Sequence, residues 1–285
     1  MKKIFTLLAL IISFSMNAQM DDNSIGTSAT GANAVAMGMG TTASGSISTA
    51  IGNANEASGT FSTSMGVSTL ASGYGSTSMG NYTVANGWHS TAMGSNTTAS
   101  GSYSTAIGLY ATASDYSSTV IGQHNSSGSS VTNNATSFST SNTAFVIGNG
   151  ENSDNKSDAF KVMFDGTTTI AGDLTINSDA RLKANITSLG GTLAKLLKID
   201  GKSYTMKKDQ SEKQKIGLLA QDIQKVFPEL VLESQGIKSV NYQGLVPVII
   251  NALKEQDRKM KEQDRKMREQ EERLERLERL VANMD

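Results

Sequence analysis

The sequence predicts a mixed fold built in segments: a parallel β-roll and a β stem come first, and a mainly α segment that ends in a coiled coil follows. Three observations predict it. Glycine recurs every fourteen residues over the first 122 positions, which indicates stacked β coils. All but four of the 25 basic residues lie from Arg181 onward. Apolar residues then recur in heptads from Val246, as in a coiled coil.

Residues 1–18 are predicted to be an export signal peptide. Lys2 and Lys3 precede a short apolar run, and small residues follow it. The run is shorter than the roughly 20 residues that a helix needs to span a bilayer. We therefore expect an exported protein at the cell surface or outside the cell, with no membrane-spanning segment in the mature chain. It has no cysteine, so its stability does not come from disulfides.

Composition excludes several function classes. No basic residue occurs between positions 4 and 155, and nucleic-acid binding needs clustered basic residues. His89 and His124 are isolated from other metal-ligating side chains, and no motif calls for a cofactor. We expect neither a metal nor a cofactor.

Each fourteen-residue unit carries two glycine turns seven residues apart, and the runs between them have strand length. The units contain one sizeable apolar side chain each: Met37, Ile51, Met65, Met79, Met93, Ile107 and Ile121. One coil of this kind encloses too little apolar surface to offset chain entropy of about 1–2 kcal/mol per residue. The period therefore predicts oligomerisation as well as a solenoid.

These repeats, over residues 24–122, resemble the YadA-like head of trimeric autotransporter adhesins. The resemblance implies a left-handed parallel β-roll in a homotrimer, with a host, glycan or surface ligand of the head as a further partner. Those adhesins end in a membrane-embedded barrel, whereas this chain ends in a charged helix.

Aromatic side chains follow the second glycine of successive units: Phe61, Tyr74, Trp88, Tyr103 and Tyr116. They either form an exposed ladder that binds a surface or glycan, or stack coil on coil to shield the turns. We favour stacking. Residues 123–177 lose the period, and the segments 144–148 and 159–166, which resemble strands that end in glycine turns, predict a β-rich stem.

Ser178 and Lys183 lie where the two unlike halves of the chain join. From spacing alone, Ser178 is the N-cap of a helix and Asp179 suits its first turn. Downstream come Gly-Leu-Leu-Ala-Gln at 217–221, Phe-Pro-Glu-Leu-Val at 227–231 and Val-Asn-Tyr at 240–242. With Ser-Asp-x-Arg-x-Lys, this series closely resembles the C-terminal intramolecular chaperone of the endosialidase and tailspike family.

The resemblance implies a domain over residues 178–250 that trimerises, aligns the upstream fibre and then cuts itself off. Carried over by motif, Ser178 is the nucleophile, Lys183 the base and Asn177-Ser178 the scissile bond. Asp179, Arg181 and Gln221 are candidates for supporting the site. Backbone N–H groups at the expected helix start are candidates for stabilising the oxyanion. On a regular helix, side chains five residues apart point about 140° apart around the axis. The dyad therefore requires either that Ser178 lie off the helix or that Ser178 and Lys183 come from different chains.

Residues 251–285 are predicted to form a coiled coil. One core row is Val246, Leu253, Met260, Met267, Leu274 and Val281, and the other is Ile249, Gln256, Gln263, Gln270, Leu277 and Met284. The heptad does not separate dimer from trimer; the family implies trimer. The sequence thus favours an exported homotrimeric fibre with single-turnover autoproteolysis. A fibre that trimerises without cutting is the main alternative. A glycan-degrading spike is disfavoured, because Glu56 and Asp115 are the only acidic residues of the repeats.

Overall fold

The computed structural model describes residues 20–21, 24–207 and 212–283. The expected signal peptide lies outside these residues. The chain forms two compact units, one ending at Ile176 and one beginning at Asn177, and each is described by itself.

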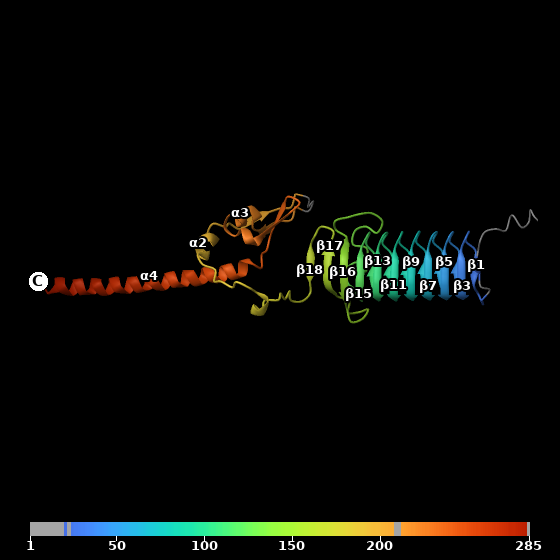
Figure 1. Ribbon diagram of the computed structural model, residues 1–285, viewed down its shortest axis with the longest axis horizontal. Helices are drawn as coiled ribbons and strands as arrows, with labels where there is room; N and C mark the ends of the chain where they lie inside the picture. Colours follow the sequence, from blue (N-terminus) through green and yellow to red (C-terminus); the bar gives the residue numbers. More distant parts are fainter. Residues whose placement is uncertain (1–19, 22–23, 208–211, 284–285) are drawn as a thin grey trace, which may run out of the picture. The chain divides into compact units, whose positions relative to one another are not determined.

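The first unit is a parallel β-solenoid (Figure 1). Each fourteen-residue coil has a longer and a shorter strand, and each strand pairs in parallel with its equivalent in the next coil, as Met65 pairs with Met79. The longer strands, which follow the two-residue β1 (Met20–Asp21), are β3 (Val35–Met39), β5 (Thr49–Asn53), β7 (Thr63–Val67), β9 (Thr77–Asn81), β11 (Thr91–Ser95), β13 (Thr105–Leu109) and β15 (Thr119–Gln123). The shorter strands are β2 (Ser28–Ala29), β4 (Thr42–Ala43), β6 (Glu56–Ala57), β8 (Leu70–Ala71), β10 (Val84–Ala85), β12 (Thr98–Ala99) and β14 (Thr112–Ala113). The predicted β-roll with a fourteen-residue repeat is confirmed.

Small side chains fill the solenoid interior. Alanines from both strands of a coil, such as Ala50 and Ala57, are 0% exposed. Ser64 stands in the slot that Ala50 fills in the preceding coil, and its hydroxyl is satisfied inside: Ser64 Oγ lies 2.6 Å from Thr69 Oγ1. The larger Met and Ile side chains stand on the opposite face of the longer strands, because side chains alternate along a strand. They are only partly covered or exposed.

The stem continues the longer-strand sheet. β16 (Thr143–Asn149) pairs in parallel with β15, and β17 (Asp158–Met163) and β18 (Thr168–Ile170) add in antiparallel fashion. Asp115, which stands in the slot that glycine fills elsewhere, is fully buried. Its carboxylate accepts the N–H groups of Thr132 at 2.5 Å and Thr143 at 2.8 Å. This buried acid therefore fixes the loop that closes the last coil.

The second unit is built on a long helix, α4 (Leu245–Ala282). Its first turns pack on Ile223, Phe227 and Leu230. The remaining elements are η1 (Ala180–Leu182), α2 (Thr192–Leu196), β19 (Lys202–Tyr204), β20 (Lys215–Gly217), α3 (Ala220–Val226), η2 (Pro228–Leu230), β21 (Val231–Ser234) and β22 (Ile237–Val240). The pairs β19–β20 and β21–β22 are antiparallel. The sequence did not predict these two small sheets within the mainly α segment.

Glu255 of α4 caps the start of α2. Its carboxylate accepts the N–H and the hydroxyl of Thr192, both at 2.8 Å, and the N–H of Leu193 at 3.2 Å. The hydroxyl of Thr192 is the largest cause that lowers the pKa of Glu255 below its ordinary value. A carboxylate with a depressed folded pKa stabilises the fold above the unfolded pKa, near 4.5, and loses this contribution as pH falls through the folded pKa.

We expect Glu255→Gln to loosen α2, because an amide keeps one acceptor but loses the charge that favours helix N–H donors. Hydrogen exchange at the amides of Thr192 and Leu193 should speed up several-fold at pH 7, and the difference from wild type should disappear as pH falls through the lowered pKa of Glu255. Glu272→Gln, on the exposed outer face of α4, is the matched control and should leave exchange in α2 unchanged. Equal exchange in both variants would show that the cap does not hold α2.

Candidate functional site

Ser178 and Lys183 meet in the structure. Lys183 Nζ donates a hydrogen bond of 2.7 Å to Ser178 Oγ. Only the single turn η1 lies between them. Ser178 precedes its N-cap, Asp179, and Lys183 is its C-cap with extended backbone angles. One tight turn thus brings together two side chains that a regular helix would hold about 140° apart. The geometric condition set by the spacing is met.

The local structure differs from the sequence prediction in two ways. The N-cap is Asp179 and not Ser178, since the Asp179 carboxylate accepts the N–H of Arg181 at 2.8 Å. The expected helix is one 3-10 turn, because Lys183 returns to the extended region. The N–H of Leu182 donates to the carbonyl of Asp179 at 3.1 Å. The N–H groups of Arg181 and Leu182 are therefore used within the turn, whereas the sequence led us to expect free N–H groups at a helix start that could hold the oxyanion.

Asp179 and Arg181 bind each other. The guanidinium lies 2.6 Å from the Asp179 carboxylate, and its hydrogen bonds are the main cause that holds the pKa of Asp179 below its ordinary value. Such an exposed pair contributes little to stability by itself. Within the described residues neither side chain hydrogen-bonds to Ser178 or Lys183, so their role in the structure is to shape the turn.

Gln221 lies elsewhere in the second unit. It lines a shallow pocket of about 310 Å³ with Tyr204, Leu218, Lys238 and Tyr242 among others. The Tyr242 hydroxyl accepts the N–H of Leu218 at 3.0 Å, which ties the end of β22 to the start of α3. No hydrogen bond among the described residues joins Gln221 to the dyad. The sequence motif that contains Tyr242 gave no sign of this contact, because it joins residues 24 positions apart.

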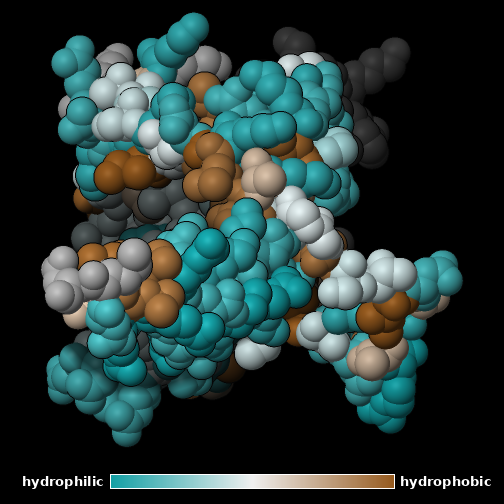
Figure 2. Space-filling view, turned by 90° about the vertical axis from the view of Figure 1, so that its left-hand side faces the viewer, coloured by the Kyte–Doolittle hydropathy of each residue, from teal (hydrophilic) through white to brown (hydrophobic). Residues whose placement is uncertain are grey.

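The segment that carries the dyad is exposed. Residues 165–191 are all exposed in the single chain, and large aliphatic side chains are among them: Leu182 is 72% and Ile186 67% exposed. Exposed apolar side chains also recur elsewhere, and Figure 2 shows hydrophobic surface among hydrophilic groups on the face that it draws. A lysine works as a base only when burial disfavours its ammonium form, and one chain does not supply that burial.

The aromatic row of the head forms a continuous stack. Ring centroids lie 5.4 Å apart for Phe61 and Tyr74, 5.6 Å for Tyr74 and Trp88, and 5.5 Å for Tyr103 and Tyr116. His89 joins it, 5.3 Å from Tyr74 and 5.5 Å from Tyr103. Coil-on-coil contact, which we favoured from the sequence, is therefore present. We call these five aromatic residues and His89 the aromatic ladder.

Neither metal-binding clusters nor spanning helices are found in the described part of the chain. No three His, Cys, Asp or Glu side chains there could hold a metal ion. None of its helices is long and apolar enough to cross a membrane. His124 stacks on Tyr110, with ring centroids 4.7 Å apart.

Comparison with known proteins finds similarity in two segments of the chain. Successive windows over residues 29–125 match the YadA head domain repeat, and residues 178–232 match the chaperone of endosialidase. The long tail fiber protein Gp37 of Escherichia phage AR1 is 31% identical over 100 residues, which are 32% of this chain and 9% of the phage protein. The two resemblances seen in the sequence are thereby confirmed.

Proposed function

We propose that the chain is the subunit of an exported homotrimeric surface fibre whose C-terminal unit aligns three chains and then cuts the bond between Asn177 and Ser178. The hydrogen bond of 2.7 Å between Lys183 and Ser178 carries this proposal. It lies at the start of the second unit, which begins at Asn177. A cut there would divide the chain close to the boundary between its two units.

The reaction needs no external substrate or cofactor. Neutral Lys183 takes the proton from Ser178 Oγ, and Oγ attacks the carbonyl carbon of Asn177. The C–N bond then breaks, the proton passes from Lys183 to the released Ser178 amine, and Asn177 is left as an ester on Oγ. Water hydrolyses the ester, which gives a carboxylate on Asn177 and restores the hydroxyl. Each chain reacts once.

Exposure of the dyad makes cleavage depend on assembly. An unperturbed lysine has a pKa of about 10.4 and is almost wholly protonated at pH 7. Contact with other copies would cover Leu182 and Ile186, and it would also bury Lys183, which lies between them in the sequence. The base therefore becomes competent only after the chains have associated, so an unassembled chain is not cut.

The head supports association of the chains. The Met and Ile side chains of the longer strands form a row in register along the solenoid, as Met93 pairs with Ile107. Both are exposed in the single chain. A continuous apolar row of this kind is typical of a surface that another copy covers.

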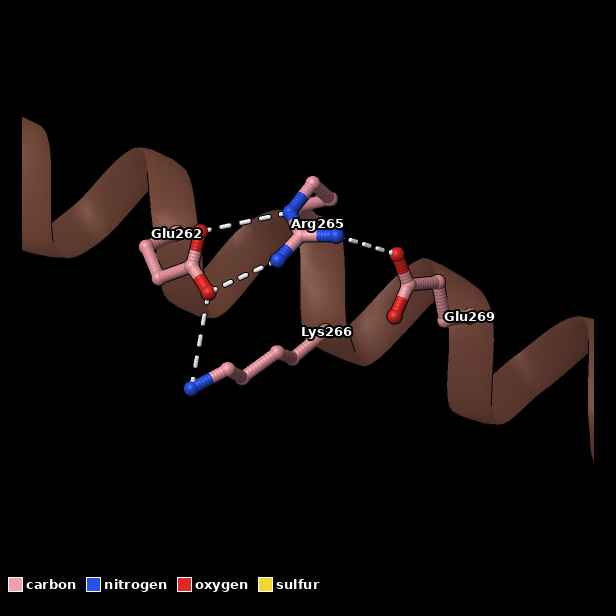
Figure 3. Close-up of polar contacts among 4 residues, drawn as sticks. All are labelled: Glu262, Arg265, Lys266 and Glu269. Carbon is pink, nitrogen blue, oxygen red and sulfur yellow. Dashed lines mark hydrogen bonds and ion pairs between the residues drawn. The ribbon is translucent and has the colours of Figure 1, made fainter.

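The long helix supports a parallel arrangement. Its apolar row at Leu253, Met260, Met267 and Leu274 is exposed. On the outer face, Arg265 bridges Glu262 at 2.8 Å and Glu269 at 2.6 Å within the helix (Figure 3). The residues beside this row carry opposite charges: a basic residue directly precedes Met260, Met267 and Leu274, and an acidic residue lies five positions after each basic one. The matching pairs are Lys259 with Asp264, Lys266 with Glu271 and Arg273 with Glu278.

In parallel, in-register helices these positions of neighbouring chains face each other with opposite charge, whereas antiparallel helices would oppose like charges. Within the described residues, neither Lys259 nor Asp264 forms an ion pair in the single chain, so both are available to a neighbour.

Charge reversal tests this arrangement. We expect Lys259→Glu to lower the thermal stability of the oligomer, since it sets a carboxylate of one helix against Asp264 of the next. The effect per pair is about 0.5 kcal/mol and repeats at each interface. Adding Asp264→Lys should restore the wild-type melting temperature at the same protein concentration. Failure of the second substitution to rescue the first would argue against parallel, in-register helices.

Cleavage is tested on the full chain itself. After assembly, intact mass and N-terminal sequencing should identify a fragment that begins at Ser178, and light scattering should give three copies of the chain. A wild-type trimer that stays full length would instead favour the alternative, a fibre whose C-terminal unit only trimerises.

A further inference from the structure

The rings of the aromatic ladder contact one another and yet remain partly exposed. Trp88 is 60% exposed, Tyr103 50% and Phe61 47%. The contacts from ring to ring order the side chains in one line along the stacked coils. They do not cover the outward surface. The aromatic ladder therefore forms an ordered, exposed apolar strip along the turns of the coils. This strip is separate from the row of Met and Ile side chains on the longer strands.

The backbone beneath the ladder is strained. Phe61, His89 and Tyr103 have φ angles of 59°, 50° and 61°, in the left-handed region that bulky side chains rarely adopt. Other coils fill the same position with Asn33 and Gly75, which tolerate this region well. The chain thus carries large rings at places where smaller residues fit with less strain.

The charge of the repeats limits the class of ligand that the aromatic ladder can bind. The repeats contain no basic residue, so the ladder lacks the positive groove that a nucleic acid or an anionic polymer requires. Of their two acidic residues, Asp115 is buried and bonded to Thr132 and Thr143. The faces of aromatic rings are electron-rich and attract the C–H faces of sugar rings. We propose that the ladder binds an extended, uncharged glycan chain that lies along the stacked coils.

Trp88 makes the proposal measurable, because it is the only tryptophan of the chain. Full-length protein is titrated with cello-oligosaccharides and laminari-oligosaccharides, which are neutral, and with oligogalacturonate, which is anionic. We expect at least one neutral series to change Trp88 emission saturably, with affinity rising with oligosaccharide length. Oligogalacturonate should produce no such change.

Two tyrosines provide a matched pair of variants. Tyr103 is in the ladder, and Tyr82 lies on the other turn of the coil, 58% exposed and also left-handed, with φ of 53°. Asparagine occupies each of these two turn positions in another coil, at Asn33 and Asn96. Tyr103→Asn should weaken binding about tenfold, whereas Tyr82→Asn should leave it within about twofold of wild type.

Several results would overturn the proposal. One is the absence of any Trp88 response to both neutral series at about 1 mM. Others are an equal effect of the two variants and an equal response to oligogalacturonate. Protection of Trp88 from acrylamide quenching in the free protein would show instead that a second copy covers the ladder.

Discussion

A chain with Ser178→Ala is expected to stay full length after assembly, with cleavage lowered at least about 10³-fold. The substitution removes the oxygen that accepts the hydrogen bond from Lys183. Lys183→Arg should have the same effect, because a guanidinium keeps its proton in proteins and does not act as a base. Ser188→Ala, on the same exposed segment, is the control and should cleave at the wild-type rate. Cleavage is followed by gel electrophoresis and N-terminal sequencing.

Mixed trimers distinguish a dyad within one chain from a dyad between chains. Ser178→Ala and Lys183→Arg chains are refolded together, each with a different tag. The hydrogen bond within one chain predicts that neither kind is cut. Cleavage of the Lys183→Arg chain alone would show that its Ser178 uses a lysine from a neighbour. Normal cleavage of pure Ser178→Ala trimers would exclude self-cleavage through this dyad altogether.

Gly80→Ala is expected to destabilise the head strongly. Gly80 has a φ of 125°, and an added Cβ would collide with the backbone carbonyl of Gly94 in the next coil. Unusual backbone angles alone cost about 1–3 kcal/mol, and the collision with backbone that is itself paired adds to this. We expect a loss of more than about 3 kcal/mol, measured by thermal unfolding with circular dichroism.

Gly166→Ala separates the cost of the backbone angle from the cost of the collision. Gly166 also has a positive φ, of 86°, but nothing lies within 4 Å of the added Cβ. It should therefore show the backbone cost alone, about 1–2 kcal/mol. Equal losses in the two variants would mean that close stacking of the coils at Gly80 is not what requires glycine.

The repeat allowed most of the head to be predicted from the sequence. Because each coil pairs with its equivalent fourteen residues later, as Met65 with Met79, the period fixes the register. The two small sheets of the second unit were not predictable in this way. β19 and β20 are separated by a long connection, and β21 and β22 are short strands without a repeat. Val231 of β21 and Val240 of β22 pack against the core around Ile223 and Phe227, a contact that no local pattern predicts.

For the candidate site, the motif alone indicated Ser178 and Lys183, because both belong to a pattern of residues that follow one another in a set order along the chain. Their contact follows from the local fold, since residues five apart meet in one tight turn and not on a regular helix. The fold likewise places Gln221 in a pocket apart from the dyad and pairs Asp179 with Arg181. A linear motif records spacing, whereas hydrogen bonds, burial and facing surfaces depend on how distant segments pack.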